Sequence, residues 1–489
     1  MTKEEKIIKI KATRQLTKAR RKGQILKTYR LKLQNLSKTD IKTLNQLFVE
    51  AKWFRNYIIA AIPDRLTSTA WKVKEVEIKN KAGLFEKRKL EHLSSHVRAG
   101  LVKEIKANLF ALEKAKEKQN KVGKLKFKSE VFELPLNQYG HTYAFNFKTN
   151  RLHIQNIKKS FRVLGLLQIP EKAEFANAKL LKKPSGFYLA VTTFLNEAPT
   201  TYKTKKGVVK QKIIATFDKP LGIDFGIKTQ LTLSTGLKIT YKVKESEKLK
   251  KLQRTLAHKQ KILIQKNILK NKKRKKKLKI KASKNAIKII KKLGKEYEHL
   301  NNQKKDIQNR IFSYAKSYKK VYFQDENVKG WQHGLFGKEI NNTSIGGIIA
   351  SLKTRLETPV LLSRYLPTTQ TCSGCGHRQK MLLTTRVFVC ESCGMELDRD
   401  INSARDMVRF GLTEKEALAP DWDEVTPAEK AAAGRVLEHN SNIHLSYSSE
   451  KQEAPAFFEE RPSHITKIEA IRKSSWKQLK NADNGSELK

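Results

Sequence analysis

Acidic residues are scarce in this chain of 489 residues: 47 Asp and Glu stand against 102 Lys and Arg, a formal net charge of +55. A compact protein with so much self-repulsion typically has a polyanion as its partner. The charge argues against an enzyme of neutral small molecules and favours nucleic acid over an anionic membrane surface. Residues 413–489 carry 11 Lys and Arg and 14 Asp and Glu, so all of the excess lies before Thr413.

Long apolar runs are missing as well. No segment approaches the ~18 apolar residues of a membrane span, and the longest run, Phe161 to Pro170, is broken by Arg162 and Gly165. The first residues, MTKEEKIIKI, are charged and lack the apolar core of a secretory signal. We therefore expect neither secretion nor a membrane partner.

Cysteine is rare, and its distribution is informative. The chain has four, arranged as two CxxC pairs with 14 residues between them: Cys372, Cys375, Cys390 and Cys393. Scattered disulfides of a secreted protein are thus excluded, and the cluster favours a metal site in a reducing compartment. The spacing predicts a closed structural Zn²⁺ site of four thiolates, which leaves no coordination position for a catalytic water.

Hydrophobic periodicity divides the chain before Lys219 into strands and helices. Residues 24–34 alternate apolar and polar side chains, which predicts a strand, and from Lys38 the apolar spacing of three and four predicts helix, continuing with interruptions to about Val122. Strand-like segments follow at 143–147, 152–154 and 186–194. This part is expected to be a β-rich module with a helical insertion.

A second unit is expected from Lys219. It begins with a strand and a Gly-rich turn, LGIDFGIKTQLTLSTG, followed by a Lys-rich helical stretch at about 245–319 whose densest run is KKRKKKLK at 272–279. Strands at 320–326 and near 359–365, the cysteine module and a helix at about 402–410 complete it. The tail after residue 412 has little periodicity and is expected to be weakly ordered.

Three acidic positions lie on separate predicted elements of this second unit. Asp224 lies on the first strand, Glu326 at the end of the strand KVYFQDE, and Asp400 at the start of the last helix. Three such carboxylates suit two Mg²⁺ ions that activate water for phosphodiester cleavage. Each alone has a simpler interpretation: an Asp between Gly222 and Gly226 as a turn residue, an Asp at a helix start as an N-cap.

The motifs LGIDFGIKTQLTLSTG, VYFQDENVKGW and TCSGCG…FVCESCGMELDRDINSARDM, in this order, resemble those of the transposon-encoded TnpB proteins and of the similar compact type V-F CRISPR effectors. The resemblance is specific over about 221–410. It extends more loosely to KTYRLKL and GFYLAVTTF in the first half, and SSEKQEAPAF from Ser448 is similar to the tail of many TnpB proteins.

The resemblance implies an α/β plus β architecture, an RNase H-like (RuvC) nuclease domain with an inserted zinc ribbon, preceded by a β-barrel-like wedge domain that carries a helical insertion. The implied boundaries are as follows: wedge 1–37 and 123–218, helical recognition insertion 38–122, nuclease 219–366 and 397–412 with its basic helical insertion at about 245–319, zinc ribbon 367–396, and flexible tail 413–489.

The resemblance further implies an RNA-guided DNA endonuclease that binds a guide RNA, recognises a short motif flanking the target and cleaves double-stranded DNA with two Mg²⁺ ions. Its catalytic and Mg²⁺-binding residues are Asp224, Glu326 and Asp400. Arg386 is expected to contact the scissile strand. The expected location is the prokaryotic cytoplasm, at the nucleoid, and both a monomer and a homodimer occur among such proteins.

One departure bears on activity. The common second motif has its glutamate where this chain has Gln324, and Glu326 lies two residues further on the same face of the strand. A turn at the strand end would bring Glu326 to the metals. The alternatives are a nuclease-inactive, RNA-guided DNA-binding protein and, with less support, a DNA transposase.

Overall fold

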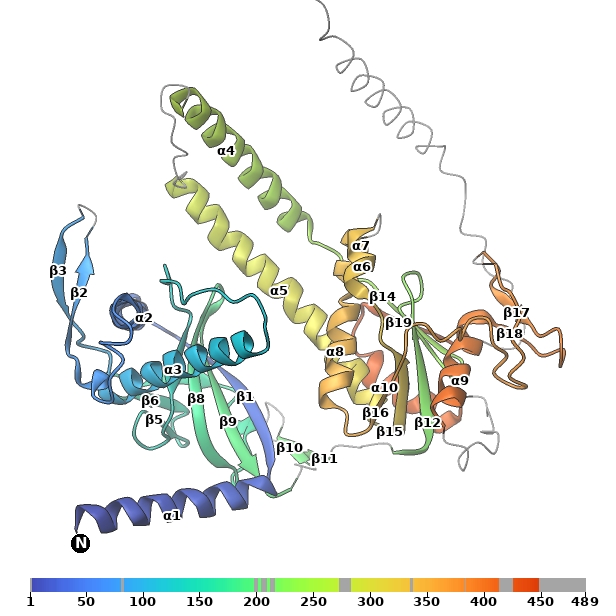
Figure 1. Ribbon diagram of the computed structural model, residues 1–489, viewed down its shortest axis with the longest axis horizontal. Coiled ribbons are helices and arrows are strands. Elements are labelled where there is room, and N and C mark those ends of the chain that lie inside the picture. The colour runs from blue at the N-terminus through green and yellow to red at the C-terminus, as the bar shows by residue number, and fades with distance from the viewer. Residues whose placement is uncertain are drawn as a thin grey trace, which may run out of the picture. The chain divides into compact units, whose positions relative to one another are not determined.

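The computed structural model describes residues 2–80, 83–197, 201–203, 209–211, 216–271, 283–334, 337–382, 384–412 and 425–447 (Figure 1). The chain forms two compact units, Met1–Ala215 with Glu245–Gln303, and Thr216–Lys244 with Lys304–Lys489. The Lys-rich run 272–279 lies outside the described residues. Among those described, no helix is both long and apolar enough to span a lipid bilayer.

The first unit contains a seven-stranded antiparallel sheet in the order β4-β8-β9-β1-β7-β6-β5. Its strands are β1 (Ile25–Gln34), β4 (Glu133–Leu136), β5 (Tyr143–Asn146), β6 (Arg151–Ile154), β7 (Phe161–Leu164), β8 (Glu174–Lys183) and β9 (Gly186–Leu195). Shorter elements are η1 (Ala70–Lys72), η2 (Leu166–Gln168), β10 (Thr201–Lys203) and β11 (Val209–Gln211).

This sheet is nearly closed into a barrel. Aromatic side chains bring its last strand β5 close to β8: the Tyr143 hydroxyl donates to the Ala176 carbonyl at 2.6 Å, and the Tyr139 and Phe175 rings stack with centroids 4.6 Å apart. Because the backbone ladder stops at β4 and β5, side-chain packing closes the remaining gap. The β-rich module expected from the sequence is therefore present.

Helices of the first unit are α1 (Lys3–Lys22), α2 (Lys38–Ala60), α3 (Ser95–Glu117) and α4 (Glu247–Asn271), and α5 (Lys284–Ala315) starts in it. Ser37 and Asp40 form the capping box that starts α2, and Leu44, Leu47 and Phe54 of α2 are buried in the core. The backbone N–H of Ser185, in the β8–β9 turn, donates to Glu298 of α5 at 2.9 Å. Helix α5 thus contacts the turn between β8 and β9.

The prediction of helix from 38 to 122 is wrong between α2 and α3. Residues there form a two-stranded hairpin, β2 (Glu75–Lys79) and β3 (Phe85–Lys89). In β2, Val76 is buried whereas Glu75 and Glu77 are exposed, so the apolar period is two and matches a strand. The alternation of β2 covers only five residues and lies between two longer helices, so the helical spacing on either side dominated the prediction.

The second unit is built on a six-stranded mixed sheet in the order β16-β15-β12-β13-β14-β19. The strands are β12 (Phe217–Phe225), β13 (Leu231–Leu233), β14 (Leu237–Tyr241), β15 (Tyr318–Gln324), β16 (Pro359–Leu362) and β19 (Ile443–Tyr447). β12, β15 and β16 run parallel, and the other neighbours pair antiparallel. The remaining elements are α6 (Val328–His333), α7 (Gly337–Thr343), α8 (Ile345–Arg355), β17 (Val387–Val389), β18 (Glu396–Asp398), α9 (Arg399–Gly411) and α10 (Pro427–Leu437).

The expectation of a weakly ordered tail after residue 412 is wrong for residues 425–447. Thr426 caps α10 through a capping box with Glu429, and β19 pairs with β14 from Ile443 to Tyr447. Glu429 is fully buried, where it accepts from the Tyr318 hydroxyl at 2.8 Å and pairs with Lys219 Nζ at 2.9 Å. These contacts anchor the segment to β12 and β15. Residues 413–424 and 448–489 lie outside the described chain.

Candidate functional site: three carboxylates and a cysteine cluster

The three acids predicted from the sequence come from neighbouring elements of the second unit. Asp224 lies on β12, Glu326 follows the end of β15, and Asp400 lies in the first turn of α9. β12 and β15 are parallel, with Ile223 opposite Phe323, so their carboxyl ends meet at one edge of the sheet. All three acidic residues are half-buried.

Gly222 determines how α9 sits on β12. A Cβ at this position would lie 1.9 Å from the Ala404 carbonyl oxygen of α9, so only glycine permits the contact. Asp224 is two residues further along the strand and shares this face, which directs it to the side that α9 covers. The sequence alone allowed Gly222 to be part of a turn around Asp224, but the structure shows that it permits the close packing of α9 on β12. Gly226 is constrained as well, since its Cβ would lie 2.5 Å from the Thr229 carbonyl oxygen.

The three carboxylates interact electrostatically. Burial raises the pKa of Asp224 well above its ordinary value, and the negative charges of Asp400 and Glu326 raise it further, against the opposing effect of Arg399. Burial also raises the pKa of Glu326, while Arg364 acts to lower it. The negative charges of these half-buried carboxylates repel one another. A hard cation such as Mg²⁺, which prefers oxygen ligands, would relieve this repulsion by binding to the carboxylate oxygens.

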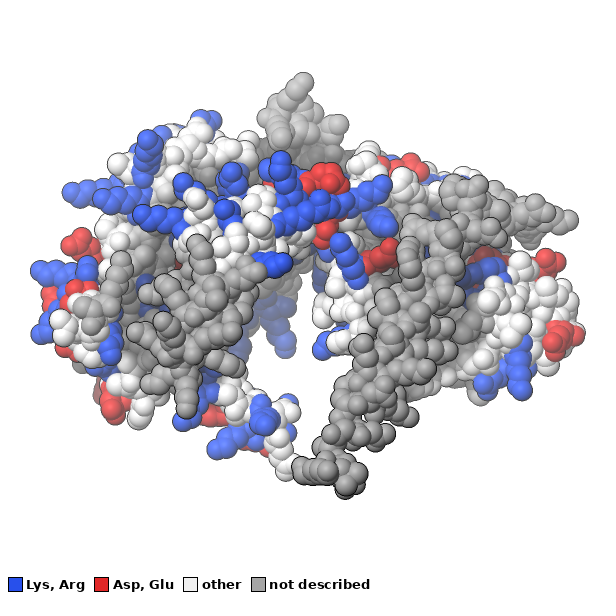
Figure 2. All heavy atoms as spheres, turned by 90° about the horizontal axis from the view of Figure 1, so that it is seen from above, with Lys and Arg blue, Asp and Glu red and all other residues white. Residues whose placement is uncertain are grey.

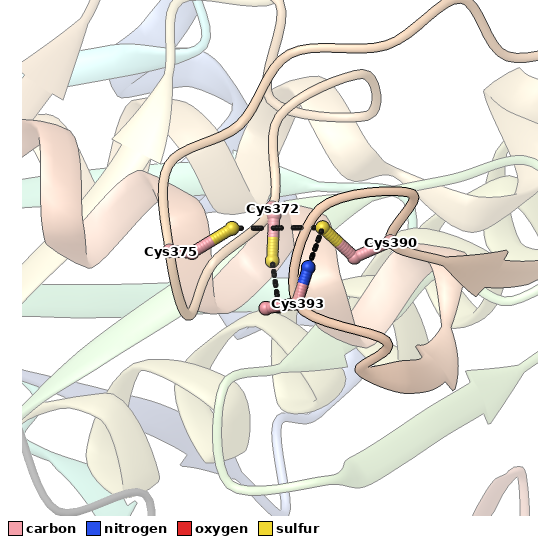
Figure 3. A group of neighbouring side chains, drawn as sticks. All are labelled: Cys372, Cys375, Cys390 and Cys393. Carbon is pink, nitrogen blue, oxygen red and sulfur yellow. Dashed lines mark hydrogen bonds between the residues drawn. The ribbon is translucent and has the colours of Figure 1, made fainter.

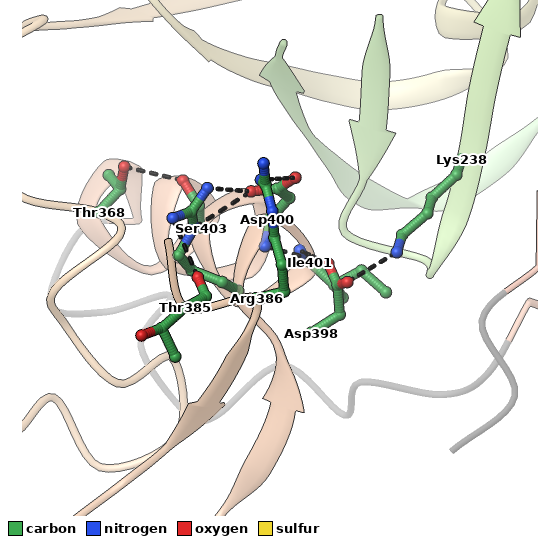
Figure 4. A network of polar contacts seen from close by, with 9 residues as sticks. Lys238, Thr368, Thr385, Arg386, Asp398, Asp400, Ile401 and Ser403 are labelled. Atoms are coloured by element: carbon green, nitrogen blue, oxygen red, sulfur yellow. Dashed lines mark hydrogen bonds and ion pairs between the residues drawn. The ribbon is translucent and has the colours of Figure 1, made fainter. Parts of the chain in front are cut away.

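Asp400 is not the N-cap of its helix. That role belongs to Asp398, whose Oδ1 accepts from the backbone N–H groups of Asp400 and Ile401 at 3.1 and 3.2 Å, while Lys238 Nζ holds its Oδ2 at 2.7 Å (Figure 4). The Asp400 carboxylate is therefore left for other partners. In the structure these are Arg399, with Nη2 at 3.2 Å, and Arg386, with Nη1 at 3.9 Å.

Gln324 and Glu326 have different surroundings. The Gln324 side chain is buried, and its Nε2 donates to the carbonyls of Ser363 and Leu366 at 3.3 and 3.0 Å, which ties it to the loop after β16. The Glu326 N–H donates to the Gln324 carbonyl at 3.0 Å. This bond closes a tight turn directly after the strand, the turn that the sequence required for Glu326 to approach the other acids.

Asp325 lies between them and points elsewhere. It forms ion pairs with Lys353 and with Arg364, the latter at 3.3 Å. Its bond to Lys353 and, to a smaller extent, its contact with Arg364 lower the pKa of Asp325 below its ordinary value. The acid next to Glu326 in sequence is therefore neutralised by bases, and the two neighbours differ in environment as the strand geometry predicts.

The four cysteines converge, as their spacing predicts (Figure 3). Their sulfur atoms all lie within 4.8 Å of one another, and within the described part of the chain they are the only group of three or more His, Cys, Asp or Glu ligands this close together. Cys372 and Cys390 are buried, and Cys375 and Cys393 are exposed. Burial opposes ionisation of Cys390, but hydrogen bonds from the N–H groups of Cys393 and Ser392 and from the neighbouring thiols together outweigh it and lower the pKa of Cys390 to about 6. The cluster can hold a metal ion.

Buried polar side chains of α9 connect the cysteine cluster to the helix that carries Asp400. Asn402 Oδ1 accepts from the Ser373 N–H at 2.9 Å, and its Nδ2 donates to the Thr371 carbonyl at 2.8 Å. The hydroxyl of the next residue, Ser403, lies 2.9 Å from the hydroxyl of Thr368. Asn402 and Ser403 are fully buried. The first cysteine knuckle is thus hydrogen-bonded directly to the start of α9.

The sequence reasoning missed Asp398, Arg399 and Lys238. Asp398 and Arg399 stand within the quoted motif DRDINSARDM, but the motif does not tell which acid caps the helix. The signal for Asp398 was its position two residues before Asp400, at the end of β18. Lys238 lies 160 residues away in sequence and carries no local signal.

Comparisons with known proteins show what this chain is similar to. Residues 357–407 match a family model described as Cas12f1-like, TNB domain. A putative RNA-guided DNA endonuclease of Streptomyces pristinaespiralis is 25% identical over 282 residues, 55% of this chain and 61% of that protein. TnpB-like protein L79 of Acanthamoeba polyphaga mimivirus is 47% identical over 53 residues, 11% of this chain and 10% of its own length.

Among solved structures, that of a Cas12f1–sgRNA–target DNA complex aligns with a TM-score of 0.40 at 14% identity, covering 79% of this chain and 99% of that one. The chain spans about three fifths of the length of the Streptomyces relative. The sequence matches confirm that the chain resembles the TnpB proteins and the type V-F CRISPR effectors.

Proposed function

We propose that the protein is an RNA-guided DNA endonuclease of the RuvC type, whose hydrolytic site consists of Asp224, Glu326 and Asp400. The observation that supports it most directly is the electrostatic coupling of these acids, with Asp400 and Glu326 both raising the pKa of Asp224. The mixed sheet, the resemblance and the net charge of +55 point the same way. Guide RNA and double-stranded DNA are the partners, and the protein recognises a short motif flanking the target.

The donor set fits Mg²⁺, because three carboxylates offer the hard oxygen ligands that this ion prefers. Mg²⁺ bound there would supply an activated water and would stabilise the leaving oxygen of the scissile phosphodiester. The chain's own residues support this arrangement: Asp398 caps the start of α9, Gly222 lets α9 approach β12, and a tight turn places Glu326 directly after the end of β15.

Two basic residues complete the proposed site. Arg386 and Arg399 flank the Asp400 carboxylate, and their guanidinium groups can donate to phosphate oxygens. We assign Arg386, which is half exposed at 53%, as the contact to the scissile strand. Arg399 is only 13% exposed and donates its Nη1 to the Thr385 carbonyl at 3.1 Å, so it positions the loop and Asp400.

The four cysteines are proposed to bind one structural Zn²⁺ in a ribbon that takes no part in the chemistry. Four thiolates close the tetrahedral coordination of zinc. The ribbon's β17 and β18 form a two-stranded sheet that flanks the second cysteine pair, and β18 leads directly into α9. By fixing the second cysteine pair, the zinc would hold the ribbon and thereby the start of α9, which carries Asp400.

The decisive experiment uses RNA that co-purifies with the protein, reprogrammed against a plasmid library with randomised flanking sequence. Wild type is expected to make Mg²⁺-dependent, guide-directed breaks. Asp224→Ala and Glu326→Ala should lose at least about 100-fold in rate, since each removes a cation ligand. Asp325→Ala is the matched control: it removes an adjacent carboxylate that is paired with Lys353 and Arg364, and it should cut nearly as well as wild type.

A nuclease-inactive, RNA-guided binding protein is the second candidate, because Gln324 stands where the second motif usually has its acid. Guide-directed binding by wild type without any break would select it. Normal cutting by Glu326→Ala would show that Glu326 is not a ligand, and equal loss in Asp325→Ala would show that the assay reports local charge rather than the site.

A further inference from the structure

The first unit contains a basic groove that the proposed hydrolytic site does not use. It has a volume of about 1050 Å³ and lies between one face of α1 and the barrel, which contributes Phe194 of β9 and Gln138. Of the residues that line it, five are cationic and none is acidic: Lys9, Arg14, Lys18, Arg21 and Lys22. In Figure 1, α1 is the dark blue helix at the N-terminus.

The lining positions on α1 form a continuous stripe. They recur every four residues in two adjacent columns, from Lys9 and Ile10 to Arg21 and Lys22, which places them on one face of the helix. The stripe is roughly 20 Å long at 1.5 Å per residue. At roughly 3.4 Å of axis per phosphate, that length matches about six consecutive phosphates of one strand.

The cations differ in their own partners. Arg21 Nη2 pairs with Glu174 Oε1 at 2.5 Å, and its guanidinium lies over the Phe194 ring at 4.5 Å. With Arg20, which pairs with Glu174 at 2.9 Å, it anchors the end of α1 to the barrel. Lys9, Arg14 and Lys18 are exposed and form no ion pair with any described residue. Their charges are available to a ligand.

The hydrogen-bond donors that line the groove indicate the chemical class of its ligand. The hydroxyl groups of Thr13 and Thr17 donate within the helix, to the carbonyls of Lys9 and Thr13, both at 2.8 Å. The donors that remain for a ligand are ammonium and guanidinium groups in a row, which suit repeated anionic oxygens more than a single carboxylate. Figure 2 shows one face of the molecule, on which the blue Lys and Arg side chains cover more of the surface than the red Asp and Glu side chains.

We propose that the groove between α1 and the barrel binds the phosphodiester backbone of a nucleic-acid strand. The inference rests on the nucleic-acid partners of the proposed function but not on its cleavage step. A bilayer surface is disfavoured, because the stripe lines a groove and contains only one exposed large apolar residue, Ile10, whereas the exposed Ile8 and Leu16 of α1 lie outside it. RNA and DNA share the backbone chemistry, and the experiment distinguishes them.

The test uses the full chain carrying Asp224→Ala, freed of nucleic acid, so that cleavage plays no part. Binding of labelled oligouridine RNA and of oligothymidine DNA of equal length is titrated from roughly 50 to 200 mM salt. The groove variant is Lys9→Gln, Arg14→Gln and Lys18→Gln together. The matched control is Lys11→Gln, Lys103→Gln and Lys106→Gln, which removes equal charge from exposed positions outside the groove. Circular dichroism checks that α1 remains helical in both.

For a single strand, each lost phosphate contact lowers the slope of log affinity against log salt by about 0.7. The groove variant should therefore lose about 2 units of slope, and the control clearly less. The better-bound probe identifies the strand as RNA or DNA. Equal slopes for groove variant and wild type, equal losses in the control, or binding of phosphatidylserine vesicles in competition with both probes would overturn the proposal. Absence of cleavage in the Asp224 form cannot affect this readout, so failure here is separable from failure of the nuclease assignment.

Discussion

Asn402 of α9 accepts a hydrogen bond at 2.9 Å from the backbone N–H of Ser373, which lies between the first two cysteines of the cluster. Asn402 is two residues after Asp400 on the same helix, and its amide also donates to the Thr371 carbonyl. The cysteine knuckle and the proposed catalytic acid are therefore joined by one fully buried side chain. A change in the knuckle has a direct path to Asp400.

Asn402→Ala should uncouple the knuckle from α9. It leaves the Ser373 N–H and the Thr371 carbonyl without their partner in a buried setting, which costs about 1–3 kcal/mol each in the least relaxed case. We expect a lower melting temperature and a loss of cleavage larger than the loss of DNA binding. The control is Ser392→Ala, an exposed position in the second knuckle, which should leave both nearly unchanged. Unchanged cleavage in a stably folded Asn402→Ala protein would contradict the coupling.

Removal of the metal should have a related effect. Chelation of the proposed zinc, or Cys375→Ser, leaves the first knuckle without its coordination, and structural zinc sites contribute directly to folding. We expect about one zinc per chain by atomic spectroscopy, and a loss of cleavage on chelation that Mg²⁺ alone does not restore but Zn²⁺ with Mg²⁺ does. Full recovery with Mg²⁺ alone would show that the cluster has no part in holding α9.

Restoring an acid at position 324 should not restore a ligand. Gln324→Glu places a carboxylate oxygen against the carbonyls of Ser363 and Leu366, where the present side chain donates. A buried acceptor facing two acceptors costs about 1–3 kcal/mol, so thermal stability should fall without a gain in cleavage. Glu326→Gln supplies the contrasting variant, with lost cleavage and near-normal stability. Recovered cleavage in the double variant would instead place residue 324 at the metal site.

Asp406 predicts a pH dependence of stability. Its carboxyl is fully buried on α9, Oδ1 accepts from Arg409 Nε at 2.8 Å, and Oδ2 has no hydrogen-bond partner in the described structure. Burial raises the pKa of Asp406 to about 7, against the opposing charge of Arg409. Since the folded state prefers the protonated form, the stability this gives is fully present below the unfolded pKa of about 3.9 and is lost as pH rises through about 7.

Asp406→Asn removes that titration. Between about pH 5.5 and 8.5 the unfolding free energy of wild type should fall by about 2 kcal/mol relative to the variant. Denaturant unfolding at both pH values measures the difference. Asp306→Asn, an exposed acid on α5 paired with Arg310, is the control and should show no comparable change. Parallel curves for wild type and Asp406→Asn would contradict the raised pKa.

Glu429 should be important for the six-stranded sheet although it lies in the expected tail. Glu429→Ala removes the buried partner of Tyr318 and of Lys219. Because Lys219 retains some exposure, at 31%, we expect a loss of about 2–3 kcal/mol rather than the full cost of an uncompensated buried ion. Glu438→Ala, an acid just after α10, is the control. A stability equal to wild type would show that α10 adds nothing to the sheet.

Local patterns predicted much of this structure. The alternation of β1 and the apolar spacing of α2 could be interpreted without knowing what these elements pack against. The cysteine spacing alone predicts the cluster, because four thiolates must converge to bind one ion. The assignment of Glu326 relied on strand periodicity plus a turn, and the bond from the Glu326 N–H to the Gln324 carbonyl supplies that turn.

Other features depend on residues distant in sequence. The cap on α9 is Asp398 rather than Asp400 because β18 ends there and Lys238, far upstream, holds its second oxygen. Gly222 could be recognised as a packing residue only once α9 was placed over β12. The strand at Ile443–Tyr447 alternates apolar and polar residues over only five positions, and its pairing with the distant β14 gives it structure.

The pairing of β19 with β14 also sets an order of events during synthesis. Lys238 meets Ser446, so roughly 200 residues are translated between the two, which takes about 10–40 s at 5–20 residues per second. Through that interval the β14 edge of the sheet has no neighbour and is open to wrong pairing. The barrel residues, by contrast, have all emerged by then. A ribosome-bound chain can thus complete its barrel well before the six-stranded sheet is whole.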